Sequence, residues 1–546
     1  MPPPAALLLL TFLLPLTATG CKNQNPVIYS LDPKIGTLGE PVTIIGSNFG
    51  NERGGSYVTI AGIQPTGSSY ISWNERRIVL TVPEFGESGL VYVHVRGKKS
   101  NSAFFTNQAG LPVKAQTGNS DLRPRINSVK PQSGPIGGAI TITGSGFGNS
   151  QDKSGVFFPR NAQTNISAPA EAIMPEFIEV SQTDFGYELW SEREIRVRVP
   201  DGAFTGNMEI RTPGGVSSPE YFTVSEKPGT KTFRDKRMYT LTTSVIINTG
   251  EAEALNSLFL WIPRPASSAS QQNVEIIQSN PQPLIENLNG TSIFKLENLK
   301  VRTESQVNIS WKVEVYRVET SVRHSSVRAE NNSPVNSMYT QSTPLIPSDD
   351  PRIQNTAAGI LGGERNHYLI AQKIYEWIIN QGIIQEGRIE HDIFIALEAN
   401  EADIYTAVLL YCAMLRSAGV PVLPVAGVLV NRNNTTVNHY WAEFWLDGFG
   451  WIPVDPAMGA GVVLSSPDMH PGQEPVSPAG FYFGNIDSRR VSFSRGFANL
   501  SPMTQGGRTV SLNRSYSMQN LWEEAAGIGS YTSFWGDVII TGIYAH

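Results

Sequence analysis

Three residue types that can perform nucleophilic chemistry together, a thiol, an imidazole and a carboxylate, occur between positions 403 and 455 as Cys412, His439 and Asp455. A thiolate is a strong nucleophile, an imidazole can be its general base, and a carboxylate can fix the tautomer of that imidazole. Whether they can act together depends on the elements that position them.

The apolar residues around them predict one helix followed by three strands. Asp403 can cap the helix, and apolar residues recur at helical spacing from position 404 to Leu415. Gly419 and Pro421 end it. The strands are predicted over residues 422–430, 439–446 and 451–455. The imidazole therefore lies on the second strand, and the carboxylate ends the third.

The order of these elements and three of their segments resemble the transglutaminase-like branch of the papain-like thiol enzymes. The segments are Leu415–Pro421, Asn438–Glu443 and Gly450–Pro456. The resemblance covers residues 349–456 and implies an α+β fold in which His439 is the catalytic base and Asp455 orients it. It also implies that the nucleophilic cysteine begins the helix, where this sequence has Ile404.

A thiol is needed at position 404 for a physical reason. A helix N-terminus offers unpaired N–H groups and about half a positive charge, which lowers the pKa of a thiol from about 8.5. Isoleucine supplies neither charge nor an electron pair. Cys412 lies further along the helix by about 12 Å, where a free cysteine normally behaves as a buried hydrophobic residue. The hydroxyls of Tyr405 and Thr406 lack the acidity of a thiol. Tyr405 and Trp441 are instead candidates to line a cleft.

Two other groupings of polar residues do not predict a metal site, and no cofactor is expected. His439 and Glu443 share one strand face but lie about 13 Å apart, too far to bind one ion. His391 and Asp392 are adjacent, so their side chains point in different directions.

The composition indicates several domains rich in β-structure. The chain has 546 residues, and single cores rarely exceed about 250–300 residues. Its 50 glycines and 37 prolines indicate many turns, and an apolar fraction of 40% argues against disorder. A formal net charge of -6 does not suggest a nucleic-acid-binding surface.

The N-terminal residues predict an export signal. An apolar run from Ala5 to Leu16 is followed by the small residues Thr17–Gly20 and then Cys21. This order resembles a bacterial lipobox and implies a signal peptide over 1–20, a lipidated Cys21 and a tether over 21–25. The alternative is plain secretion with an incidental cysteine. With 2 cysteines in the chain, no disulfide framework is expected.

An internal repeat follows. The pattern from Ile28 to Gly50 recurs 98 residues later, from Ile126 to Gly148. Trp73–Arg76 returns as Trp190–Arg193 at an offset of 117 residues, so the second copy contains an insertion, expected around Pro159–Glu179.

Each copy predicts an antiparallel sandwich, because short period-2 strands such as Val91–Val95 alternate with turns. The sequence over 26–107 and over 124–225 resembles the IPT/TIG module, which has an immunoglobulin-like fold. The glycine-rich segments Gly46–Gly50 and Gly144–Gly148 are not expected to bind phosphate, because no helix is predicted after either.

The rest of the chain completes a multidomain organisation of all-β sandwiches followed by an α+β domain. We expect a third β-sandwich over 230–332, a linker over 333–351, the transglutaminase-like core over 352–457 and a β-rich C-terminal region over 458–546. Helices are predicted over 353–361 and 369–380, and C-terminal strands over 480–484, 490–494 and 535–540.

These features predict a lipoprotein on the periplasmic or surface face of the bacterial cell envelope. It would bind or scaffold envelope proteins, peptides or polysaccharide, and no nucleic acid. Ile404 favours loss of the reaction. The alternative is an active thiol-dependent transglutaminase, amidase or peptidase in which Cys412 reaches His439.

Overall fold

The structure is a computed structural model of the chain. It describes residues 25–33, 35–36, 39–82, 89–107, 123–151, 153–160, 176–181, 186–225, 228–288, 290–328, 334–385, 392–431, 434–462, 477–497, 507–510, 515–518 and 521–545. The expected signal peptide, Cys21 and His391 lie outside these residues. Within them, no helix is both long and apolar enough to cross a membrane.

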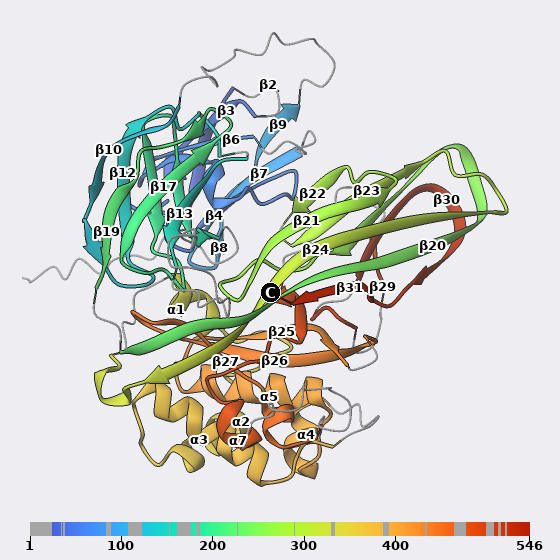
Figure 1. The fold of residues 1–546 in the computed structure, drawn as a ribbon. Helices are drawn as coiled ribbons and strands as arrows, with labels where there is room; N and C mark the ends of the chain where they lie inside the picture. Colours follow the sequence, from blue (N-terminus) through green and yellow to red (C-terminus); the bar gives the residue numbers. More distant parts are fainter. Residues whose placement is uncertain are drawn as a thin grey trace, which may run out of the picture.

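The two repeats form two β-sandwiches, as predicted, and they lie side by side at one end of the molecule (Figure 1). The first module has sheets ordered β1-β3-β6-β5 and β2-β9-β7-β4, with β8 paired to β7. Its strands are β1 (Val27–Asp32), β2 (Ile35–Gly36), β3 (Pro41–Ser47), β4 (Tyr57–Ile60), β5 (Tyr70–Trp73), β6 (Arg77–Thr81), β7 (Gly89–Val95), β8 (Lys98–Lys99) and β9 (Ala103–Asn107). Alternation along the strands builds its core; in β3, for example, Val42 and Ile44 are buried between partly exposed neighbours.

The second module repeats this arrangement with one extra strand. Its sheets are β10-β12-β16-β15 and β11-β19-β17-β13-β14, with β18 paired to β17. Its strands are β10 (Arg125–Lys130), β11 (Ser133–Gly134), β12 (Ala139–Ser145), β13 (Gly155–Pro159), β14 (Phe177–Glu179), β15 (Tyr187–Trp190), β16 (Glu194–Arg198), β17 (Gly206–Thr212), β18 (Gly215–Val216) and β19 (Glu220–Val224). The extra strand, β14, lies at the end of the range where the insertion was expected.

The glycine-rich loops of both modules bind a carboxylate of the protein itself. Asn48 and Gly50 donate their backbone N–H groups to Glu75, at 3.0 and 2.9 Å. Gly146 and Gly148 donate theirs to Glu192, at 2.7 and 2.8 Å. These N–H groups are therefore already used, which explains why the loops need neither a following helix nor a phosphate.

The middle of the chain forms one long sheet, ordered β21-β24-β20-β23-β22. Its strands are β20 (Gly229–Pro263), β21 (Gln271–Asn280), β22 (Ile285–Leu288), β23 (Thr291–Glu297) and β24 (Thr303–Val322). The expected third sandwich is instead one continuous sheet, the middle β-domain, because β20 is long enough to pair with β24 along its first part and with β23 along its last part.

The C-terminal region contributes strands to both the middle β-domain and the sheet that contains β25 (Val422–Val430). Its strands are β28 (Arg490–Arg495), β29 (Gly507–Val510), β30 (Leu521–Trp535) and β31 (Ile539–Ala545). Strands β30 and β31 both pair with β20, and β29 pairs with β30. Of the predicted C-terminal strands, the one over 490–494 is confirmed. The predicted strand over 535–540 is interrupted between β30 and β31.

The strand predicted over 480–484 is wrong. These residues enter a short helix, α7 (Pro478–Phe481), because Ser477 caps it and Pro478 occupies its first position.

All helices except the first gather at the opposite end from the repeats, against the sheet β27-β26-β25-β28 (Figure 1), whereas the first packs in the apolar cluster of the second module. The helices are α1 (Pro334–Tyr339), which lies in the predicted linker, α2 (Pro351–Leu361), α3 (His367–Asn380), α4 (Ile393–Ala399), α5 (Ile404–Ser417) and α6 (Pro456–Gly459). The strands are β25 (Val422–Val430), β26 (Thr436–Leu446) and β27 (Gly450–Val454). Helices α2, α3 and α4 contact α5, which is the central helix.

The core sheet is covered on both faces. Tyr440 and Phe444 of β26 pack with the helices, whereas Trp441 and Trp445 join an apolar cluster with the second module and the middle β-domain. All nine residues of β25 are buried for this reason.

Candidate active site

The candidate site is built from a strand and the start of a short helix. His439 lies on β26, opposite Gly427 of β25, and is fully buried. Asp455 follows β27 and caps α6 by accepting a hydrogen bond from Met458 N at 3.0 Å. The backbone thus fixes one oxygen of the carboxylate and leaves the other for the imidazole.

The structure brings His439 and Asp455 together, as the sequence predicted. His439 Nε2 lies 2.6 Å from Asp455 Oδ2. In a neutral imidazole this contact places the proton on Nε2 and leaves Nδ1 as the proton acceptor. His439 Nδ1 is buried and has no hydrogen-bond partner among the residues that the structure describes. The acceptor atom of a general base is therefore present and unused.

Two residues that sequence reasoning missed extend this pair. Arg490 of β28 donates to Asp455 Oδ2 at 2.7 Å and to Asp487 Oδ2 at 2.5 Å. Tyr482 also donates to Asp487, at 3.2 Å. Burial alone would raise the pKa of Asp455, but His439 and Arg490 outweigh it and lower that pKa to about 2. Asp455 is therefore an anion held between two donors.

The position where the resemblance implies a cysteine holds a hydrocarbon side chain. Ile404 is the first residue of α5, and Asp403 caps this helix by accepting from Thr406 N at 2.8 Å. The Ile404 side chain is half-buried and packs on the apolar core. The helix start predicted from the sequence is confirmed.

Comparison with known proteins identifies the domains. Residues 354–456 match the transglutaminase-like superfamily, and residues 26–109 and 124–225 match the IPT/TIG domain. The chain contains two IPT/TIG domains and one transglutaminase-like domain. An uncharacterized protein of Haemophilus influenzae is 23% identical over 302 residues, which are 47% of this chain and 78% of that protein.

Two solved structures are also similar. One, a candidate cysteine protease from Cytophaga hutchinsonii, is 14% identical, covers 58% of this chain and 92% of its own, and has a TM-score of 0.34. The other, a surface glycan-binding protein from Prevotella bryantii, is 10% identical, covers 54% of this chain and 98% of its own, and has a TM-score of 0.13. At such low identities and TM-scores, neither likeness carries a functional argument.

Cys412 does not complete the site of the transglutaminase-like domain. It lies inside α5, is fully buried, and burial raises the pKa of its thiol to about 12. Among the described residues, no sulfur is in hydrogen-bond contact with His439 Nδ1. Cys412 is a buried hydrophobic residue, as its mid-helix position predicted.

The two candidate cleft residues lie apart from each other. Trp441 is 3% exposed and stacks on His439, with ring centroids 6.2 Å apart, inside the cluster shared with the second IPT/TIG domain. Tyr405 packs edge-on against Tyr440, at 5.1 Å, on the side of the helices. Trp441 therefore belongs to a domain contact.

No group of three or more metal-ligating side chains that could hold an ion occurs in the described part of the chain. Glu443, which the sequence placed on the strand of His439, pairs instead with Arg495 at 2.6 Å.

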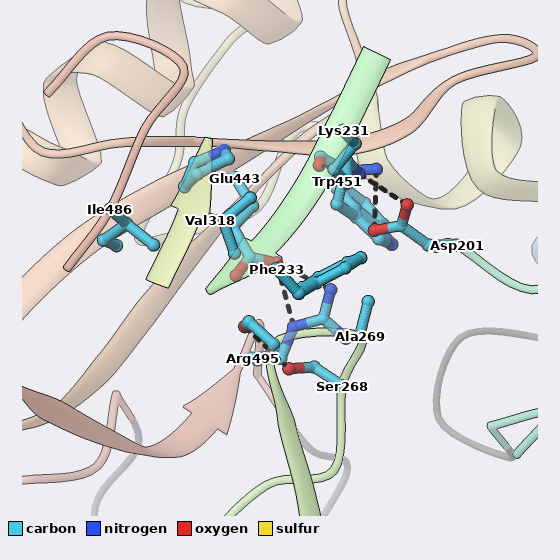
Figure 2. Close-up of a pocket in the computed structure, with 12 residues that line it drawn as sticks. Asp201, Lys231, Phe233, Ser268, Ala269, Val318, Glu443, Trp451, Ile486 and Arg495 are labelled. Carbon is cyan, nitrogen blue, oxygen red and sulfur yellow. Dashed lines mark hydrogen bonds and ion pairs between the residues drawn. The ribbon is translucent and has the colours of Figure 1, made fainter. Parts of the chain in front are cut away.

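A pocket lies where the second IPT/TIG domain, the middle β-domain and the transglutaminase-like domain meet (Figure 2). Its empty volume is about 300 Å³, including space open to solvent. Lys231 donates to Asp201 at 2.5 Å and to Trp451 O at 2.6 Å, and the Glu443–Arg495 pair forms another wall. Lys231 pairs with Asp201, and Arg495 pairs with Glu443, so the charged side chains of the pocket bind one another. These contacts hold three domains together at the pocket.

Proposed function

We propose that the protein is an envelope-anchored binding or scaffolding protein whose transglutaminase-like domain no longer performs acyl transfer. The observation that carries the proposal is the intact His439–Asp455 pair combined with Ile404 at the start of α5. Acyl transfer through a thioester needs a nucleophilic sulfur, and a hydrocarbon side chain cannot form the covalent intermediate. Envelope proteins, peptides or polysaccharide are the partners that we propose.

The retention of His439 and Asp455 does not require catalysis. Asp455 is fully buried, and removing one partner of a buried ion pair costs on the order of 3–5 kcal/mol. Its bonds to His439 and Arg490 therefore stabilise the fold in an inactive protein as well.

The sequence before the first IPT/TIG domain supports the anchoring part of the proposal. The apolar run ends in small residues directly before Cys21, which is the order that export followed by lipidation requires. Mass spectrometry of the mature N-terminus tests this: an unmodified N-terminus at another residue would refute the anchor.

An acyl-transfer assay tests the loss of reaction. Purified full-length protein is incubated with a glutamine-containing protein and a fluorescent primary amine. We expect no incorporation above that of the His439→Gln variant. Incorporation that depends on His439 would refute the proposal.

The reverse substitution tests whether position 404 is the nucleophile position. In Ile404→Cys, the helix N-terminus should lower the pKa of the new thiol below about 8.5, and contact with the imidazole of His439 would lower that pKa further. The pH dependence of alkylation by iodoacetamide measures this pKa, with native Cys412 as the internal control. A normal pKa that does not change in the Ile404→Cys/His439→Gln variant would show that position 404 does not belong to the site.

The alternative function is an active thiol-dependent transglutaminase, amidase or peptidase. The unused, buried His439 Nδ1 favours it, because a general base would present that atom to its nucleophile. The same assay on Cys412→Ser distinguishes the two: loss of a His439-dependent activity in that variant would identify Cys412 as the nucleophile.

A further inference from the structure

One outward surface of the first IPT/TIG domain carries an aromatic cluster. Strands β4 and β7 pair with each other and alternate between core and surface. The inward residues are Val58, Ile60, Val91 and Val93, each with an exposed fraction of 0%. The outward residues are Tyr57, Thr59, Tyr92 and His94, and Lys99 of β8 pairs with His94. We call these five outward residues the aromatic face.

The rings of the aromatic face contact one another. Tyr57 and His94 stack nearly parallel, with centroids 4.4 Å apart and an interplanar angle of 9°. Tyr92 meets His94 edge-on at 6.5 Å, and Lys99 Nζ lies 3.5 Å from the centroid of the Tyr92 ring. All three rings are partly exposed, and Lys99 is exposed. The cluster is thus an apolar platform with a cation at one end.

The second IPT/TIG domain shows that this platform is not needed for the fold. In the first domain the hydroxyl of Ser100 accepts a hydrogen bond from Val93 N, and in the second the hydroxyl of Ser217 accepts one from Ile210 N. These two bonds are equivalent, so residues in this part of the two domains correspond at an offset of 117 residues. At this offset Tyr92, His94 and Lys99 correspond to Glu209, Arg211 and Val216. Tyr57 and Thr59 precede the insertion and correspond to Gly155 and Phe157 at the offset of 98 residues, at which Val58 N and Val156 N each donate to a tyrosine hydroxyl. The same sandwich therefore forms with an ion pair at the positions of Tyr92 and His94.

The charges beside the aromatic face are positive. Arg96, Lys98 and Lys99 occur within four positions in and after the turn from β7 to β8. Burial, followed by the charge of Lys99, lowers the pKa of His94, so the positive charge at neutral pH comes from the arginine and lysines. An anionic partner complements this edge.

We propose that the aromatic face binds an acidic polysaccharide, with sugar rings packed on Tyr57 and Tyr92 and sugar carboxylates paired with Lys99. The flat C–H face of a pyranose matches the face of an aromatic ring, and partly exposed tyrosines provide large contact areas at a low cost in conformational entropy. Exposed Lys99 can exchange its contact with Tyr92 for a carboxylate. This inference rests on the proposed binding role and specifies its ligand.

Affinity electrophoresis of the full-length protein in gels containing polygalacturonate tests the proposal. The first variant is Tyr57→Ala/Tyr92→Ala. The second is Tyr92→Glu/His94→Arg, which introduces residues that the second domain already accommodates at these positions. The control is Tyr221→Ala, which removes a tyrosine that is 60% exposed on the second domain. Fully methyl-esterified polygalacturonate and poly-L-glutamate are the comparison polymers.

We expect retardation of the wild type by polygalacturonate, an affinity lower by about tenfold in both variants, and an unchanged affinity in the control. Methyl-esterified polymer should bind more weakly, because it lacks the carboxylates. Absence of retardation, an unchanged affinity in the two variants, or equal retardation by poly-L-glutamate would overturn the proposal; the last result would indicate an acidic protein partner. These variants do not change position 404. A negative result in this experiment would therefore not contradict the proposed loss of acyl transfer.

Discussion

Replacing Arg490 with methionine should destabilise the transglutaminase-like domain, and more at neutral than at acidic pH. Arg490 is 3% exposed and is bonded to both Asp455 and Asp487. Methionine fills a similar volume without charge. The variant leaves two buried carboxylates without the cation between them, which should cost on the order of 3–5 kcal/mol at pH 7.

The pH dependence follows from the pKa of Asp455. This pKa is about 2 in the folded protein against 3.8 for the free group, which corresponds to about 2.4 kcal/mol of stability. That contribution is present above about pH 4 and is lost as the pH falls through about 2. Without Arg490, burial should raise the pKa of the carboxyl, so the variant gains stability relative to the wild type as the pH falls from 7 to 4. The difference in unfolding free energy should shrink by about 1–2 kcal/mol.

Urea unfolding of full-length protein in a Cys21→Ser background measures this effect. Cys412 is then the only thiol, and its exposure to 4,4'-dithiodipyridine, which reacts at acidic pH, reports the opening of α5. The matched control is Arg416→Met, because Arg416 is also buried but donates to the backbone oxygens of Val422 and Gln341. Its loss of stability should be equal at pH 7 and pH 4. A pH-independent loss in Arg490→Met, or one below about 1 kcal/mol, would refute the electrostatic reasoning.

Three further predictions concern other sites. Native Cys412 should react with thiol reagents at less than about 1% of its rate in the urea-unfolded chain, because the thiol is fully buried and burial raises its pKa to about 12, so little thiolate forms at pH 7 to 9; fast native labelling would contradict the burial. Glu75→Ala and Glu192→Ala should each destabilise their own IPT/TIG domain by about 1–3 kcal/mol, as hydrogen exchange of the loop amides would show, whereas exchange unchanged in both variants would contradict it. Lys231→Met leaves the carboxylate of Asp201 without its cation and should accelerate proteolysis at the junction of three domains; an unchanged cleavage pattern would show that the ion pair does not hold the domains together.

The sequence predicts His439 and Asp455 as a pair because adjacent elements carry them. Strands β26 and β27 form a hairpin, and the alternation along each strand fixes its register. Arg490 is different. A strand over 490–494 is evident from the sequence, but its pairing with β25 depends on tertiary packing. The spacing of residues along the sequence therefore could not predict the contact between Arg490 and Asp455.

The C-terminal region shows the same limit. Alternation predicts strands there, but pairing with β20 depends on contacts far apart in the sequence. The aromatic run between two glycines at residues 480–484 suggested a strand. Its first residues form a short helix instead, because Ser477 caps that helix and Pro478 occupies its first position.

The pairing of β30 and β31 with β20 constrains how this chain can be shortened. Thr243 donates to the backbone oxygen of Gly536, 293 residues away, so the transglutaminase-like domain is inserted between strands of one sheet, and β30 and β31 are synthesised after it. A chain ending after Pro456 would leave one edge of β20 unpaired, and such an edge invites self-association. Closure of that sheet must also wait until the transglutaminase-like domain has been synthesised, which favours slow folding of the middle β-domain. Strands β30 and β31 are therefore required by the middle β-domain, whose first strand is β20.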